Sequence, residues 1–165
     1  MTRIMRKWWL ALCAAGSIAL NGAAGSAQPI RNSKTGALQI GEVASVYVQA
    51  RPKWNHSGIR LVRGGKYLIT AQGTWWDAGS RHGPDGDGSP NFYMRWSEGL
   101  RRVRHENWFK LICALDSQKK TAFPVGSNRP TVAAADGELT CFANDVGFAY
   151  GNNTGAIQMT VKRTG

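Results

Sequence analysis

The chain has 165 residues, with 21 Lys and Arg against 10 Asp and Glu, which gives a formal charge of +11. This length is typical of one domain. A hydrophobic content of 42% with 7 Trp excludes a disordered chain, and 20 Gly with only 3 Cys exclude both a collagen and a disulfide-dense miniprotein. The charge alone would indicate a nucleic-acid partner.

Residues 1–27 have the pattern of a secretory signal peptide. Three basic residues precede an apolar run of 13 residues, Trp8 to Leu20, and small residues occupy positions 25–27. The run is shorter than the roughly 20 residues of a membrane-spanning helix, although an uncleaved anchor is the alternative. Removing the signal leaves 138 residues with 18 basic and 10 acidic side chains, a charge of +8. We therefore expect a secreted or periplasmic protein with no transmembrane segment after cleavage and no nucleic-acid partner.

The remaining chain is expected to contain a flexible lead-in, residues 28–41, and one β-domain, residues 42–165. Its predicted strands are residues 43–50, 66–72, 108–115, 138–143 and 156–162. The last strand is the clearest, because Ile157, Met159 and Val161 alternate with polar residues. Turn clusters rich in Gly and Asn separate the strands, including residues 83–88, 126–130 and 151–155. No sustained helical period is present, so the pattern predicts an all-β fold, a β-sandwich or a small barrel.

The stretch from Asn144 to Gly155 joins two predicted strands and concentrates oxygen donors. Asp145 offers a carboxylate, and Asn152 and Asn153 offer side-chain carbonyls. Calcium prefers six to eight such oxygens, and glycines allow backbone carbonyls to turn inward. The residues thus fit either a calcium loop or a turn-rich hairpin connection, and the spacing is not that of an EF-hand.

The same stretch resembles the calcium loop of the PA-I galactophilic lectin family, which consists of small secreted bacterial lectins. The matching residues are Asn144-Asp145-Val146, Tyr150-Gly151-Asn152-Asn153 and Gly155, at the family's spacing. Gly83-Pro84-Asp85-Gly86-Asp87 is similar to the family's GPxGD element, and residues 65–73 are similar to the strand before it. This resemblance, over about residues 64–162, implies a jelly-roll-like β-sandwich with one Ca²⁺ per subunit.

The resemblance also implies a set of site residues. The metal ligands would be Asp145, Ala149, Asn152, Asn153 and Asp77, with backbone carbonyls from Ala149 and near Asp77. Two vicinal sugar hydroxyls would complete the coordination, and galactose presents a cis pair at O3 and O4. Sugar contacts would come from Asp145, Asn152, Asn153, Trp76 and Asp87. The expected function is therefore calcium-dependent binding of galactose-containing glycans, with Trp75 or Trp76 exposed near the site.

The chain departs from the family after Asp87. The family has a histidine and a glutamine there that contact the sugar, whereas this chain has Gly88-Ser89-Pro90-Asn91. The following segment, residues 91–107, is longer and carries four arginines, Arg95, Arg101, Arg102 and Arg104. This basic run fits either a solvated loop or a surface for anionic cell-surface polymers. The alternative function is thus a calcium-stabilised adhesion module that binds anionic partners.

Catalysis is not expected from this sequence. It has no Gly-x-Ser-x-Gly element, and its three histidines do not have zinc-ligand spacing. Cys113 and Cys141 remain after signal removal, and they fit either a disulfide or two packed thiols. The sequence leaves self-association into a homo-oligomer open.

Overall fold

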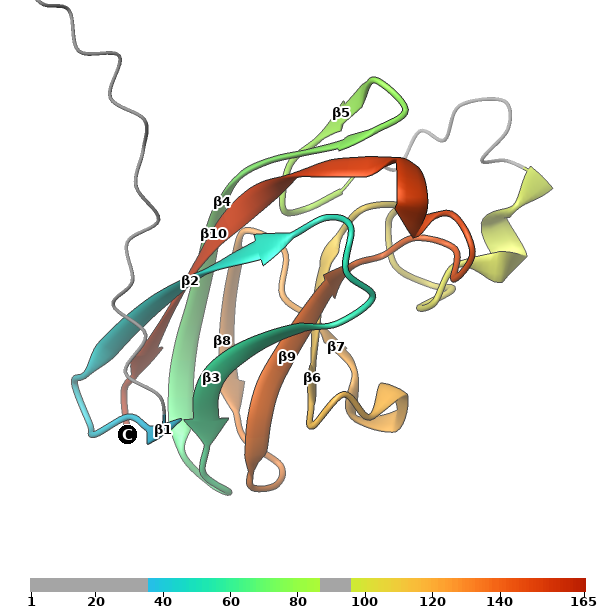
Figure 1. Ribbon diagram of the computed structural model, residues 1–165. Helices are drawn as coiled ribbons and strands as arrows, with labels where there is room; N and C mark the ends of the chain where they lie inside the picture. Colours follow the sequence, from blue (N-terminus) through green and yellow to red (C-terminus); the bar gives the residue numbers. More distant parts are fainter. Residues whose placement is uncertain (1–35, 87–95) are drawn as a thin grey trace, which may run out of the picture.

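The computed structural model describes residues 36–86 and 96–165, and two β-sheets pack face to face in it (Figure 1). The first sheet has the order β1 (Gly36–Ala37), β3 (Asn55–Leu61), β9 (Gly137–Ala143), β6 (Leu111–Leu115) and β7 (Phe123–Pro124). The second has the order β2 (Val43–Gln49), β10 (Asn153–Arg163), β4 (Lys66–Asp77) and β5 (Ser80–His82), and β8 (Asn128–Val132) also pairs with β4. The expected all-β sandwich is confirmed. Within these described ranges, no helix is long and apolar enough to cross a membrane.

The centre of the second sheet is the antiparallel pair β4 and β10. Its register runs from Asp77 opposite Asn153 to Tyr67 opposite Arg163. Side chains on a strand alternate between faces, so one face of β4 buries Tyr67, Ile69 and Trp75 against the first sheet. In both β4 and β10 the alternation continues beyond the predicted range, which was 66–72 for β4 and 156–162 for β10.

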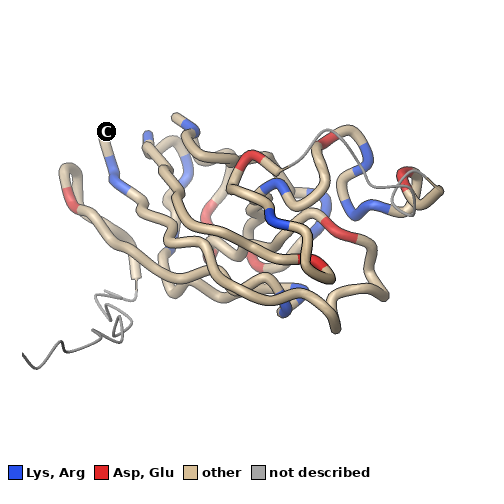
Figure 2. Tube along the Cα trace, turned by 90° about the horizontal axis from the view of Figure 1, so that it is seen from above, with Lys and Arg blue, Asp and Glu red and all other residues tan. Residues whose placement is uncertain are grey.

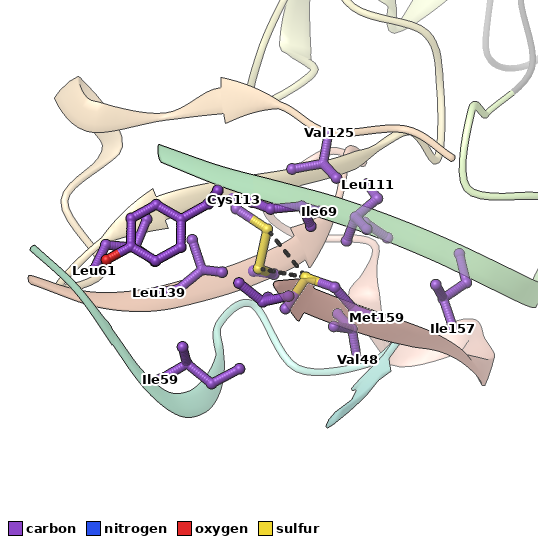
Figure 3. Packing of buried hydrophobic residues seen from close by; sticks show 14 of the residues in the cluster. Val48, Ile59, Leu61, Ile69, Leu111, Cys113, Val125, Leu139, Ile157 and Met159 are labelled. Carbon is purple, nitrogen blue, oxygen red and sulfur yellow. Dashed lines mark hydrogen bonds between the residues drawn. A yellow bond between two sulfur atoms is a disulfide. The ribbon is translucent and has the colours of Figure 1, made fainter. Parts of the chain in front are cut away.

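The core between the sheets is aromatic and aliphatic around one disulfide. Cys113 and Cys141 lie opposite each other on β6 and β9, with their Cα atoms 4.0 Å apart, and form a disulfide. Both sulfur atoms contact the Met159 sulfur of the facing sheet, at 3.7 and 3.6 Å respectively (Figure 3). The disulfide thus joins two central strands at the middle of the hydrophobic core, and it decides between the alternatives that the sequence left open.

The strand predicted at 108–115 is shorter in the structure. Trp108 and Phe109 are buried, but Phe109 has a φ of +57°, which no strand accommodates, and β6 begins only at Leu111. The Lys110 amide donates to the Asn107 carbonyl at 3.3 Å, which closes a turn before the strand. The apolar run therefore combines a buried turn with a strand.

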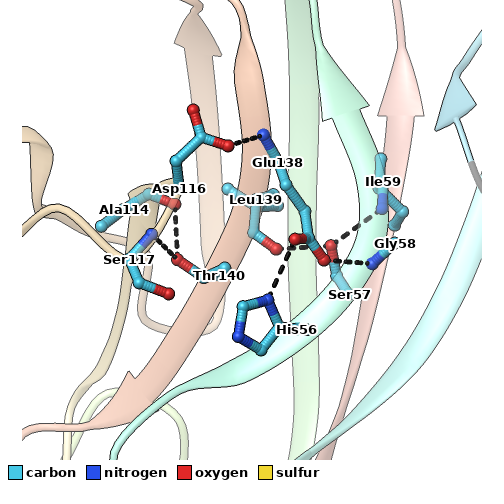
Figure 4. Close-up of polar contacts among 10 residues, drawn as sticks. All are labelled: His56, Ser57, Gly58, Ile59, Ala114, Asp116, Ser117, Glu138, Leu139 and Thr140. Carbon is cyan, nitrogen blue, oxygen red and sulfur yellow. Dashed lines mark hydrogen bonds and ion pairs between the residues drawn. The ribbon is translucent and has the colours of Figure 1, made fainter.

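Five strands, β1, β3, β5, β7 and β8, lie where the sequence predicted none, and β3 and β8 are the longest of them. The turn cluster at 126–130 overlaps β8, in which Pro130 lies opposite Leu68, as an edge strand tolerates. β3 is irregular, because its pairing with β9 shifts register between His56 and Arg60. Glu138 holds this bulge: its carboxylate accepts the Gly58 amide at 2.9 Å and contacts His56 Nδ1 at 3.0 Å (Figure 4).

The start of the described chain belongs to the sandwich. β1 pairs in parallel with β3, and the Leu38 side chain is fully buried. A flexible lead-in was expected over residues 28–41. The last six of these residues, 36–41, instead belong to the folded sandwich. The signal peptide predicted at 1–27 and the rest of the lead-in lie outside the described residues.

Candidate functional site

The predicted oxygen donors meet at one end of the sandwich. Asp77 is the last residue of β4 and lies directly opposite Asn153, the first residue of β10. Residues 144–152 connect β9 to β10 and finish in the 3₁₀ turn η3 (Tyr150–Asn152), at the upper right of Figure 1. The connection is shorter than the predicted dozen residues, because β10 begins at Asn153.

Four polar side chains form two carboxylate–amide pairs in this site. Asn153 Nδ2 donates to Asp145 Oδ2 at 2.9 Å, and Asn152 Nδ2 donates to Asp77 Oδ1 at 2.8 Å. The other Asp145 oxygen accepts the Val146 amide at 2.7 Å. Asp145 is 3% exposed and Asn153 is fully buried. The structure therefore brings together four of the five predicted ligand residues through direct side-chain contacts.

The electrostatic environment of the site disfavours two ionised carboxylates without a compensating positive charge. Burial is the main cause that raises the pKa of Asp145; hydrogen bonds from Asn153 and Val146 oppose the shift, and the negative charge of Asp77 adds to it. The protonated Asp145 carboxyl is thus favoured more in the folded state than in the unfolded state. The free energy of unfolding therefore falls as the pH rises through the raised pKa of Asp145. Ionisation of Asp145 therefore carries a free-energy cost in the folded state, and a bound cation would offset that cost.

One oxygen in the site lacks a hydrogen-bond donor. Asn153 Oδ1 is buried and has no hydrogen-bond partner among the described residues. A buried acceptor without a donor costs roughly 1–3 kcal/mol, so such an atom indicates a missing ligand. The described residues contain no group of three or more His, Cys, Asp or Glu that could hold a metal. Any metal here would therefore need amide and carbonyl oxygens as ligands in addition to the two carboxylates. Such a donor set suits Ca²⁺.

The fifth predicted ligand, Ala149, lies at the start of η3. Its carbonyl accepts the Asn152 amide at 3.4 Å, a long hydrogen bond that leaves this oxygen capable of a further contact. Ala149 also packs against the hydrophobic core, which fixes the backbone just before η3.

The aromatic residues of the site differ from each other in exposure. Trp75 is fully buried and donates its indole N–H to the Val48 carbonyl at 3.1 Å, whereas Trp76 is 42% exposed. Because neighbouring side chains on a strand point to opposite faces, Trp76 lies on the face of β4 opposite to that of Asp77. Asp87, the remaining predicted sugar contact, lies outside the described residues.

Sequence reasoning did not identify Asn144 as an anchor for the basic run. Its buried side chain accepts the Val103 amide at 2.9 Å and donates to three backbone carbonyls, those of Val103, Glu106 and Asn107. A fully buried amide with so many partners fixes the segment beside the site. The signal in the sequence was only that Asn144 stands next to Asp145.

The positions of Lys and Arg are spread along the chain trace of the domain in Figure 2. Within the segment, Arg101 stacks on Trp108 at 5.3 Å and donates to the Arg104 carbonyl at 2.9 Å, while Arg104 and His105 are exposed. Arg95 lies outside the described residues. Arg101 is thus held against its own segment, whereas the exposed Arg104 and His105 fit the solvated-loop interpretation.

Tyr150 supplies a pH-dependent test of how η3 is anchored. Its hydroxyl donates to the Ala143 carbonyl at 2.5 Å, and burial, partly offset by Arg102, raises its pKa to about 12. We expect Tyr150→Phe to cost about 1–3 kcal/mol at pH 7. The unfolded tyrosine ionises near pH 10, so the advantage of the wild type over the variant is full below pH 10 and is lost as the pH rises towards 12.

Urea denaturation of both proteins at pH 7, 9 and 11 measures this difference. The gap in unfolding free energy between the wild type and Tyr150→Phe should narrow by about 1.4 kcal/mol from pH 9 to pH 11. Subtracting the variant removes the titration of lysines, which both proteins share. A gap that is constant over this range would show that the buried hydroxyl does not titrate as described.

No protein-family model and no curated protein matches the chain. Among solved structures, the chain is similar to the N-terminal domain of EclA, described as a PllA-like lectin. The TM-score is 0.55 and the sequence identity is 23%, over 72% of this chain and 94% of that one. At this identity the likeness shows the fold: the chain has the β-sandwich fold of that lectin domain.

Proposed function

We propose that this protein is a calcium-dependent lectin that binds galactose or related sugars without transforming them. The observation that carries the proposal is the buried Asp145–Asn153 pair, in which an amide oxygen without a donor lies beside a carboxylate whose ionisation is disfavoured. Both features are costs in the metal-free chain, and both are relieved by one cation. The fold similarity to a lectin domain supports the same function.

The proposed Ca²⁺ would be held by oxygens from two parts of the chain. Asp145, Ala149, Asn152 and Asn153 come from the β9–β10 connection, and Asp77 comes from the end of β4. Asn152 would turn its amide to present oxygen instead of the Nδ2 that now faces Asp77. When bound, the ion supplies coordination positions that two vicinal sugar hydroxyls can take from water, and galactose offers such a pair at O3 and O4.

The same residues would orient the sugar. Asp145, Asn152 and Asn153 carry carboxylate and amide groups that can bond the hydroxyls bound to the ion. Trp76 and Asp87 stay predictions, and Trp76 would reach the sugar only around the end of β4, because β10 and β5 pair with β4 on either side of it. Free sugars should bind modestly, so tight adhesion would need several sites in a homo-oligomer.

We further propose that the protein is exported, to the periplasm or outside the cell. The disulfide between Cys113 and Cys141 supports this location, because such bonds persist mainly in oxidising compartments. The signal-peptide pattern of residues 1–27 agrees with it. Mass spectrometry of the mature protein would test the cleavage after Ala27.

The direct test combines calcium, a chelator and immobilised sugars. We expect Ca²⁺ at 100 times its Kd to stabilise the protein by about 2.7 kcal/mol, and Mg²⁺ to do so far less, because this donor set suits a larger, irregularly coordinated ion. Galactose resin should retain the protein with Ca²⁺ and release it with EGTA, and a glucose resin serves as the control. Retention that EGTA leaves unchanged would contradict the metal-bridged mechanism, and retention lost only with salt would favour the anionic-partner alternative.

A further inference from the structure

A short segment of the basic run pairs with the backbone around Asp145. Arg101 forms an antiparallel bridge with Val146, and the Arg102 amide donates to the Asp145 carbonyl at 3.1 Å. Val103 bonds the Asn144 side chain, as described above. Three successive residues of the segment thus contact three successive residues of the β9–β10 connection, and the middle contact falls on Asp145.

The Arg102 side chain turns inward onto aromatic rings. Its guanidinium carbon lies 3.5 Å from the Phe142 ring centre, 4.4 Å from that of Trp54 and 5.7 Å from that of Tyr150. Arg102 Nη1 also donates to the Lys53 carbonyl and, at 3.1 Å, to the Tyr150 hydroxyl. A guanidinium held by stacking and hydrogen bonds in this way has lost much of its freedom to bind an external anion.

Arg102 therefore touches both parts of the connection that carries the donors. Its amide holds the backbone of Asp145. Its guanidinium holds Tyr150, the first residue of η3, whose last residue is Asn152 and which is followed by Asn153. Among the described residues of the segment, no other residue contacts Asp145 with its backbone and Tyr150 with its side chain.

We propose that Arg102 is a positioning residue, which holds Asp145 and the Asn152–Asn153 pair at a fixed separation. Its role at a calcium site rests on the function proposed above, whereas its ordering of the loop does not. The basic run then serves the site from inside the protein, instead of offering this arginine to an anionic partner. The Arg104 side chain, exposed and two residues away, makes neither contact among the described residues, so Arg104 provides a matched control.

Amide hydrogen exchange in the metal-free protein tests the positioning directly. The Val146 amide, bonded to Asp145 Oδ1, reports on the loop, and the amides of Ile157 and Val161 in β10 report on the whole fold. We expect Arg102→Met to accelerate exchange at Val146 about tenfold, because a bond to a charged group is worth roughly 1.5–3 kcal/mol. Exchange in β10 is expected to accelerate by up to a similar factor, because global unfolding also breaks the Arg102 contacts, whereas all three amides in Arg104→Met should stay within about twofold of the wild type.

Two results would overturn the proposal. One is equal exchange at Val146 in Arg102→Met and Arg104→Met. The other is acceleration in β10 with Val146 unchanged, which would mean that the Arg102 contacts stabilise the whole fold without restraining the loop. If Arg102→Met does not fold, Tyr150→Phe removes the same guanidinium–hydroxyl contact and is expected to accelerate Val146 as well, beside the β10 acceleration that its loss of global stability causes. An unchanged Val146 rate in Tyr150→Phe would count equally against the proposal.

Calcium titration separates this proposal from the lectin function. If the wild type binds Ca²⁺, we expect Arg102→Met to raise the Kd about tenfold, as for the loss of an outer partner of a metal ligand, and Arg102→Lys to rescue little because it cannot reproduce the planar stacking. Arg104→Met should bind as the wild type does. If the wild type binds no Ca²⁺, the lectin proposal fails, and the exchange pattern alone decides whether Arg102 orders the loop.

Discussion

Replacing Asp145 with alanine is expected to abolish calcium binding and, with it, retention on galactose resin. Asp145 is the only acidic residue of the β9–β10 connection, and its buried carboxylate already bonds Asn153 across the site. Losing an outer partner of a metal ligand typically costs about 10–100-fold in affinity, so losing the charged ligand itself should cost more. Isothermal titration with Ca²⁺ and resin retention measure the two effects separately.

One further variant separates the effect of charge from that of shape at position 145. A second variant, at another acidic residue, serves as a control. Asp145→Asn keeps the size of the side chain and one carbonyl oxygen, so binding lost in both Asp145→Asn and Asp145→Ala identifies the charge as the requirement. Glu98→Ala removes one exposed negative charge from the neighbouring 3₁₀ turn η1 (Glu98–Leu100) and should bind Ca²⁺ as the wild type does. Calcium binding that survives in Asp145→Asn with unchanged affinity would contradict the proposed ligand set.

The metal-free variants also have an expected stability. Ionisation of the buried Asp145 is disfavoured in the folded state, but its two oxygens accept hydrogen bonds from Val146 and Asn153. Removing the carboxylate relieves the first cost and leaves two donors without their acceptor. These effects oppose each other, so the unfolding free energy of Asp145→Ala in EGTA should stay within about 2 kcal/mol of the wild type. Loss of calcium binding would then not be a consequence of unfolding.

The strands that could be predicted are those with a regular alternation. Ile157, Met159 and Val161 face the core in β10, and Tyr67 and Ile69 do so in β4. β3 could not be predicted, because its bulge breaks the alternation and the Glu138 side chain that holds it comes from a strand about 80 residues away. β8 was hidden by Pro130, which reads as a turn residue but is accepted at a sheet edge.

The candidate site could be predicted in part for a similar reason. Asp145, Asn152 and Asn153 are close in sequence, so their clustering was visible in the loop itself. Asp77 was placed only through a family resemblance, and the structure brings it to the site through its pairing with Asn153. The role of Arg102 depends on rings from Trp54, Phe142 and Tyr150, whose convergence is a long-range property that no local spacing reports.

Removing the disulfide is expected to lower the stability of the domain more than any surface substitution. Cys113 and Cys141 are 28 residues apart in sequence, and a closed loop of this length is worth about 3.5 kcal/mol through the entropy of the unfolded chain. For a domain of this size that corresponds to about 10 °C in Tm. The double variant Cys113→Ala/Cys141→Ala also leaves space beside the buried Met159, which adds to the loss.

Thermal unfolding with and without reductant distinguishes the bond from the packing. Both cysteines are fully buried, so a reductant should reach the bond only through unfolding, and its effect on the wild type should depend on the scan rate. The double variant should be insensitive to reductant. If the wild type and the double variant unfold within about 2 °C of each other, the cross-link contributes little, and hydrophobic packing of the two sheets alone must hold the β6–β9 pair against β10. A loss near 10 °C would instead make the cross-link a main stabiliser of β9, the strand that carries Cys141 and leads into Asp145.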